Sequence, residues 1–184
     1  MFLNYKINFN STYANRGMGL ENDINITNKY YIDNDIALIY KKPTPIRITK
    51  TDYNSMRITD GFFETQSTLD YNGIYKGYYI EFDAKETKSK TSYSINNIHK
   101  HQIEHIKKVI RHGGIVFLIV RFTLINKDYI LMGEDLMEYL KDNDRKSIPL
   151  SYFEENCYKI SIKYAPRLDY IKIIDELLKE KWII

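Results

Sequence analysis

The chain has 184 residues, of which 43% are hydrophobic and 14% aromatic, and its formal net charge is only +3. This composition suffices for the core of one compact domain and excludes a disordered polar chain. The single cysteine, Cys157, excludes an intramolecular disulfide and suits a reducing compartment. Because the chain has no leader-like start and no apolar run long enough to cross a bilayer, we expect a cytoplasmic protein with no membrane partner.

The first third of the chain predicts a helix followed by a strand. Apolar residues recur at spacings of three and four across 20–31, which is the pattern of a helix with one buried face. A short apolar run at 36–40 predicts a strand. Pro43 and Pro45 then enforce an extended exit from that strand.

Segment 46–66 has a different character. Its apolar residues alternate weakly around turn candidates at 53–55 and 60–61, and they are too few for a core strand pair. We therefore predict a hairpin that projects from the body of a single domain spanning the whole chain, 1–184. Lys50 and Arg57 are expected near its tip.

The rest of the chain alternates strands and helices. Strands are predicted at 68–72 and 78–85, joined by a turn through Gly73 to Gly77, and a helix at 99–112 ends at a glycine pair. The apolar run 115–122 predicts a central strand that is covered on both faces. Further elements are a strand at 129–132, helices at 134–141 and 168–181, and one more strand between these two helices. This order predicts an α/β (α+β) fold with a mixed sheet flanked by helices.

Two acids and a lysine stand out within the predicted strands. Asp70 ends the first strand of the pair, and Asp83 and Lys85 share one face of the second strand with Glu81. Two carboxylates can bind a hard cation such as Mg²⁺, and an ammonium can offset charge on a phosphate during hydrolysis. Acids and lysines at strand ends are also common without any function, so the spacing by itself is a weak signal.

A second candidate is the HQIEH sequence at 101–105, which matches the H-x-x-E-H pattern of inverted zinc peptidases. It lies in segment 85–112, which holds seven Lys or Arg against two acids and all four histidines. A basic helix that faces DNA explains these histidines equally well.

A third candidate is the start of the first helix. Arg16 could hold a phosphate there, and Glu21 could point at the metal site. A capped helix with a solvated arginine and an acid in its first turn explains both residues as well.

Seven blocks of the sequence, in one order, resemble the RecU-type Holliday junction resolvases of the restriction-endonuclease-like nuclease superfamily. The likeness extends over 15–177. The blocks are NRGM at 15–18, KKPTP at 41–45, STLDYNG at 67–73, YKG at 75–77, AKETK at 84–88, HQIEH at 101–105 and RLDY at 167–170.

The resemblance implies a Mg²⁺ site, with Mn²⁺ as a possible substitute, formed by Thr68, Asp70, Asp83 and Gln102. Lys85 would stabilise the transition state. The chain departs from the family pattern at position 83, where glutamate is usual, and an aspartate withdraws the carboxylate by one methylene. Glu81, on the same strand face, is a conceivable substitute ligand.

The resemblance also implies a structure-selective endonuclease of DNA recombination and repair, associated with the nucleoid. It would act as a homodimer that makes two symmetric nicks in four-way junction DNA, and it could interact with a RecA-type recombinase. The projecting hairpin corresponds to the stalk of the family. Residues expected to contact DNA are Arg16, Lys50, Arg57 and Lys88. The aspartate at position 83 leaves one alternative, an architectural protein that binds junctions with a weakened nuclease site.

Overall fold

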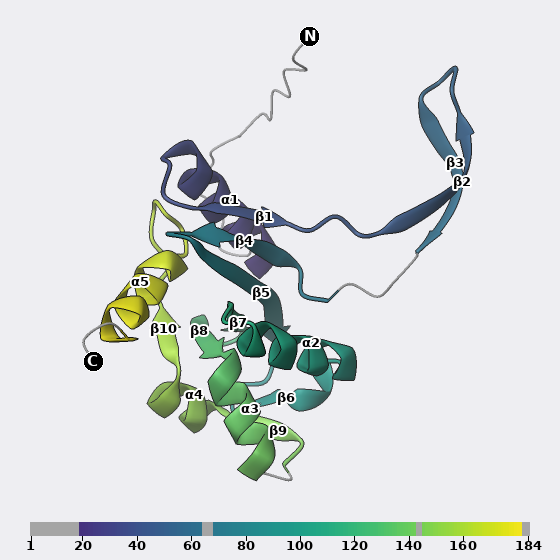
Figure 1. The fold of residues 1–184 in the computed structure, drawn as a ribbon. Coiled ribbons are helices and arrows are strands. Elements are labelled where there is room, and N and C mark those ends of the chain that lie inside the picture. Colours follow the sequence, from purple (N-terminus) through teal and green to yellow (C-terminus); the bar gives the residue numbers. More distant parts are fainter. Residues whose placement is uncertain (1–18, 64–67, 143–144, 182–184) are drawn as a thin grey trace.

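The computed structural model describes residues 19–63, 68–142 and 145–181 (Figure 1). Its centre is a six-stranded sheet in which β5 and β7 run parallel while the other neighbouring strands run antiparallel. This is the predicted mixed sheet. In spatial order the strands are β1 (Leu38–Lys41), β4 (Tyr71–Tyr75), β5 (Tyr78–Thr87), β7 (Ile115–Phe122), β8 (Lys127–Met132) and β10 (Tyr158–Ile160).

Helices cover both faces of the sheet. Along β7, Phe117 and Ile119 pack on one face, and Leu118 and Val120 pack on the other. The first face is covered by α1 (Leu20–Asp33) and α5 (Tyr170–Lys181), and the second by α2 (Lys100–Arg111), α3 (Gly133–Asp142) and α4 (Leu150–Asn156). The prediction that 115–122 is a central strand buried on both faces is therefore confirmed.

Aromatic rings join the three strands nearest the centre. Tyr71, Phe82 and Phe117 are directly opposite one another on β4, β5 and β7. The Phe82 ring stacks on Tyr71 at a centroid distance of 4.9 Å and on Phe117 at 4.8 Å. Stacked rings add specific attraction to the large area that each of them buries, so this row holds the strands in register.

The turn between β4 and β5 differs from the prediction. It contains only Lys76 and Gly77, which both have positive φ angles, as a two-residue hairpin turn that matches the strand twist requires. Gly73 lies inside β4 instead. A Cβ atom there would come within 2.0 Å of the Leu38 carbonyl oxygen, so glycine at this position lets β1 approach β4.

Strands β2 (Ile46–Asp52) and β3 (Arg57–Phe63) pair antiparallel and project from the body of the molecule (Figure 1). Asp52 begins their turn, because its Oδ1 accepts a hydrogen bond of 2.9 Å from the Asn54 amide. The predicted turn at 60–61 is wrong, since Asp60 and Gly61 lie within β3 opposite β2. The last predicted hairpin residues, 64–66, lie outside the described residues.

Several short elements were not predicted. They pair with distant segments: Ser92 of β6 (Ser92–Ser94), for example, is opposite Pro149 of β9 (Ser147–Pro149). A 3₁₀ turn at Ile95–Asn97 and helix α4 complete the set, whereas β10 lies where a strand was predicted between the last two helices. Elements this short carry little periodicity of their own, and their form depends on the partners they meet in the fold.

Candidate active site

Strand β5 carries acids on one face and apolar side chains on the other, as the alternation predicts. Ile80 and Phe82 belong to the core beneath α1 and α5. Glu81 and Asp83 point to the opposite face, toward α2, and both are buried. A buried carboxylate is stable only with hydrogen-bonding or charged partners, so the surroundings of these two acids decide their roles.

Asp70 lies beside Asp83 just before β4, rather than at the end of a strand as predicted. Burial raises the pKa of Asp70 above its ordinary value, and the neighbouring charge of Asp83 raises it further. The charges of Lys85 and Lys41 act in the opposite direction. Two carboxylates this close repel each other, and a divalent cation between them would relieve that repulsion.

Gln102, in the first turn of α2, connects three of the predicted site residues. Its Nε2 donates hydrogen bonds to Asp83 Oδ2 at 2.7 Å and to the Thr68 carbonyl at 3.0 Å. Its Oε1 accepts a bond of 3.3 Å from Lys85 Nζ, which also lies 2.8 Å from Asp83 Oδ2. The fold thus brings together Thr68, Asp70, Asp83, Lys85 and Gln102 from three separate segments.

The donor set of this cluster fits a hard cation such as Mg²⁺. Asp83 Oδ1 is buried and has no hydrogen-bond partner among the described residues. Carboxylate, amide and hydroxyl oxygens are the ligands that Mg²⁺ takes in proteins, usually together with several waters. Within the described ranges, no three His, Cys, Asp or Glu side chains converge on a metal position. The cluster has only two carboxylates, so oxygens of Thr68, Gln102 or water would complete the coordination.

Both carboxylate oxygens of Glu81 already bond to other side chains, which does not favour Glu81 as a metal ligand in place of Asp83. Its Oε1 lies 2.5 Å from Lys42 Nζ, and its Oε2 lies 2.8 Å from His105 Nε2 and 3.0 Å from the Tyr79 hydroxyl. Burial alone would raise the pKa of Glu81, but the hydrogen bonds from Lys42 and His105 outweigh it and lower the pKa. We call Lys42, Tyr79, Glu81 and His105 the Glu81 cluster.

Lys42 and His105 were missed as partners of Glu81 by sequence reasoning. Both stand in blocks that the sequence singled out, KKPTP and HQIEH. Each is far from Glu81 in the chain, however, so no local spacing could have paired them.

The geometry does not support the zinc-peptidase alternative. His105 pairs with Glu81, whereas the His101 ring stacks on the His99 ring at a centroid distance of 5.4 Å. The carboxylate of Glu104 pairs with Lys107 at 2.7 Å on the exposed side of α2. The three residues of the H-x-x-E-H pattern therefore do not point to one metal position.

Three of the four residues predicted to contact DNA are described, and all three are exposed. Lys50 and Arg57 are exposed on the projecting hairpin, and Lys88 is exposed just after β5. Arg16 lies outside the described residues. Glu21, which could have pointed at the metal site, instead pairs with Lys41 at 2.5 Å.

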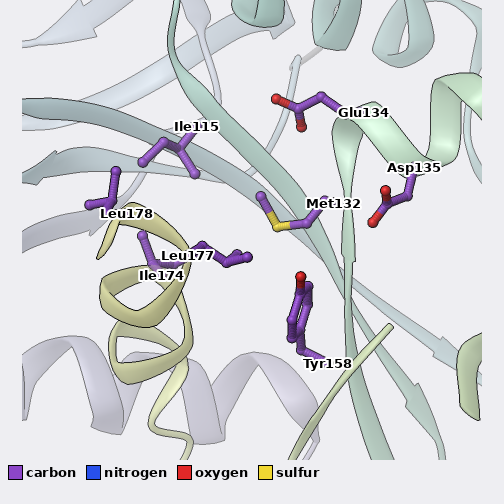
Figure 2. A pocket seen from close by; sticks show the side chains of 8 residues that line it. All are labelled: Ile115, Met132, Glu134, Asp135, Tyr158, Ile174, Leu177 and Leu178. Atoms are coloured by element: carbon purple, nitrogen blue, oxygen red, sulfur yellow. The ribbon is translucent and has the colours of Figure 1, made fainter. Parts of the chain in front are cut away.

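An apolar groove of about 190 Å³ lies elsewhere, between α5 and the start of β7 (Figure 2). It is lined by Ile115, Met132, Glu134, Asp135, Tyr158, Ile174, Leu177 and Leu178. None of these side chains belongs to the candidate site, so the groove and the site are separate features.

The chain is similar in sequence to known Holliday junction resolvases. A Holliday junction resolvase RecU of Geobacillus kaustophilus (strain HTA426) is 47% identical over 171 residues, covering 90% of this chain and 86% of that protein. A Holliday junction resolvase RecU of Staphylococcus aureus (strain JH9) is 46% identical over 178 residues, covering 94% of this chain and 86% of that protein.

Among solved structures, the Holliday junction resolvase Hjc of Archaeoglobus fulgidus matches 74% of this chain and 94% of its own, with 7% identity and a TM-score of 0.42. A likeness that distant adds nothing to the argument. No helix within the described ranges combines the length and the apolar content that a bilayer-spanning segment requires. The family model for Recombination protein U matches residues 15–176. Given this match over most of its length, the chain belongs to the Recombination protein U family.

Proposed function

We propose that this protein is a Mg²⁺-dependent endonuclease that resolves Holliday junctions by paired nicks. Its relatives in the family carry the name Holliday junction resolvase. The observation that carries the proposal for this chain is the buried, unpartnered Oδ1 of Asp83 beside Asp70, in a carboxylate pair flanked by a lysine. This combination is suited to hydrolysis of a phosphodiester.

Thr68, Asp70, Asp83 and Gln102 would hold Mg²⁺ or, as a substitute, Mn²⁺. The bound ion supplies an activated water and offsets negative charge on the phosphate. The chain itself fixes the ligands: the Gln102 amide holds the Asp83 carboxylate at 2.7 Å and also ties it to the Thr68 carbonyl. Such hydrogen bonds around a ligand set its orientation before the substrate arrives.

Lys85 would act on the phosphate directly. Its ammonium lies 2.8 Å from Asp83 Oδ2, and its side chain is 16% exposed, so it is both oriented by the site and open to a bound strand. A positive charge held at this place stabilises the extra negative charge that develops on the phosphate during attack.

Resolution of a four-way junction requires two symmetric cuts, which a two-fold homodimer would provide through its two sites. The exposed hairpin with Lys50 and Arg57 would contact the junction away from the scissile phosphates. We also propose a RecA-type recombinase as partner, and a place at the nucleoid in the cytoplasm.

The test uses purified protein, Mg²⁺ and a synthetic four-way junction, with nicked duplexes as the expected product. Asp70→Asn should bind the junction but lower the cleavage rate by about 10³-fold or more, since it removes a ligand charge. Asp33→Asn is the matched control, because Asp33 is exposed and pairs only with Lys29 among the ion pairs of the described residues. Junctions that stay intact after prolonged incubation with Mg²⁺ or Mn²⁺ would refute the proposal.

A second candidate function rests on the aspartate at position 83. If the shorter side chain does not hold the metal, the protein would bind junctions without cutting them. Cleavage that appears only after Asp83→Glu would favour this architectural role. Cleavage by the unmodified protein excludes it.

A further inference from the structure

Lys42 lies where the projecting hairpin joins the body of the molecule, beside the candidate site, and it connects the two ends of the hairpin segment. It follows β1 on the outgoing side of the hairpin, whereas Thr68 and Asp70 stand on the returning side. The Lys42 amide donates a hydrogen bond of 2.7 Å to the Asp70 carbonyl. Its Nζ donates a bond of 2.7 Å to Thr68 Oγ1. One residue therefore holds two of the proposed metal-ligating residues, one through its main chain and the other through its side chain.

The ammonium of Lys42 is itself fixed by a buried acid. Glu81 is 1% exposed and lies 2.5 Å from Lys42 Nζ through Oε1, an oxygen that also accepts a bond of 3.3 Å from Thr68 Oγ1. Removing one partner of a buried pair leaves an uncompensated charge, which is costly. The Lys42 ammonium is thus held in one position instead of moving freely in solvent.

The Glu81 cluster also orients α2. Gln102 and His105, three residues apart on the helix, bond to Asp83 and Glu81, two residues apart on β5. Three helical residues rise about 4.5 Å and two strand residues about 6.6 Å, so one face of the helix can reach both acids. Glu81 therefore links the three segments that carry the proposed ligands: the hairpin's returning segment, β5 and α2.

We infer that Lys42 is a positioning residue of the proposed nuclease: held by Glu81, it fixes Thr68 and Asp70 relative to Asp83. The inference rests on the proposed function, because it assigns to Lys42 the geometry of that site. Lys42 differs in this from Lys85, which reaches toward the substrate. Loss of contacts that orient ligands typically weakens metal affinity or activity about 10- to 100-fold.

The test separates positioning from mere folding by using three variants. Lys42→Met removes the donor to Thr68 and also leaves Glu81 uncompensated. Lys42→Met/Glu81→Gln removes both charges and keeps an amide that Tyr79 and His105 can still bond. Lys127→Met is the matched control, because Lys127 lies on β8, two strands away from β5 in the sheet, and forms an ion pair with Glu154 of α4.

Three properties are measured for each variant: thermal unfolding without metal, Mn²⁺ affinity of the free protein by calorimetry, and cleavage of a four-way junction at several Mg²⁺ concentrations. Lys42→Met should unfold at a clearly lower temperature, and the double variant should regain most of that loss. Both should bind Mn²⁺ about 10- to 100-fold more weakly than the unmodified protein and need correspondingly more Mg²⁺ for cleavage. Lys127→Met should leave metal affinity and cleavage unchanged.

Lys42→Arg gives a further folded variant, since it keeps a positive charge beside Glu81 but presents its donors in a planar fork. Its Mn²⁺ affinity should also fall. Unchanged Mn²⁺ affinity in the double variant or in Lys42→Arg overturns the inference while leaving the nuclease proposal standing. An unmodified protein that neither binds Mn²⁺ nor cleaves the junction instead overturns the proposed function.

Discussion

The hairpin β2–β3 and the strand pair β5–β7 are both regular β-structure, yet their side chains have opposite surroundings. Seven of the eight residues of β7 are buried, whereas none of the residues of β2 or β3 is. The central strands are held by side chains packed on both faces. The hairpin is held by its backbone ladder and its turn, so its side chains are free to contact a partner.

The two regions also differ in whether their acidic side chains are exposed or buried. In the hairpin, Thr49 donates to Asp60 in an exposed hydrogen bond of 2.5 Å, and water can replace it at little cost. On β5, Glu81 and Asp83 are buried, and each of them bonds to a residue of another segment, Glu81 to Lys42 and Asp83 to Gln102. A buried carboxylate holds the segments that it bonds in one relative position, whereas an exposed carboxylate leaves its neighbours free to move.

The largest expected difference in unfolding free energy between the central strands and the hairpin comes from replacing one phenylalanine in each. Phe82 is 0% exposed within the aromatic stack of β5, and Phe63 is 74% exposed in the hairpin. Phe82→Ala should lower the free energy of unfolding by about 3–5 kcal/mol, because it leaves a cavity in the stack. Phe63→Ala should change it by no more than about 0.5 kcal/mol. Denaturant unfolding measures both, and equal losses would show that the hairpin side chains are packed as tightly as those of the central strands.

Two glycines give a smaller effect of the same kind. A Cβ at Gly73 would lie 2.0 Å from the Leu38 carbonyl oxygen, and one at Gly61 would lie 3.0 Å from the Arg47 carbonyl oxygen. Gly73→Ala should cost about 1–3 kcal/mol, because β1 and β4 would have to separate inside the packed sheet. Gly61→Ala should cost less than about 1 kcal/mol, since the hairpin can bend away. A larger loss for Gly61→Ala would show that the hairpin is as rigid as the sheet.

The smallest effect concerns the charges of the hairpin. Lys50→Ala/Arg57→Ala should leave the free energy of unfolding unchanged, since both side chains are exposed. It should weaken junction binding several-fold and lower the slope of log affinity against log salt by about 2, one for each lost phosphate contact. Lys29→Ala/Lys172→Ala, which removes two exposed lysines from helices, is the matched control. An unchanged salt slope would exclude phosphate contacts at Lys50 and Arg57.

Sequence periodicity predicted the long elements well and the turns poorly. The helices around 20–31 and 99–112 and the central strand at 115–122 were confirmed, because each buries a regular stripe or run of apolar residues. The turn assigned to Gly73–Gly77 was wrong in its start, since Gly73 serves the close approach of another strand. That approach is a tertiary contact, and a single glycine in the sequence does not reveal it.

The residues of the candidate site were likewise predicted only in part by sequence periodicity. Alternation along 80–85 correctly put Glu81, Asp83 and Lys85 on one face, because successive strand residues point to opposite sides. The membership of Thr68 and Gln102 came from the family resemblance rather than from spacing. In the structure the Gln102 amide bonds to both the Asp83 carboxylate and the Thr68 carbonyl.

Local periodicity along the chain was enough to predict the central strands, the main helices, the projecting hairpin and the face of β5 that carries the acids. Which partners each acid has depends instead on how distant segments come together in the fold. Glu81 and Asp83 have the same chemistry and share one strand face. Lys42 and His105 bond to the Glu81 carboxylate, whereas one oxygen of Asp83 has no hydrogen-bond partner among the described residues. The partners come from distant segments, and the pKa and bonding of a buried carboxylate depend on those partners rather than on its own place in the chain.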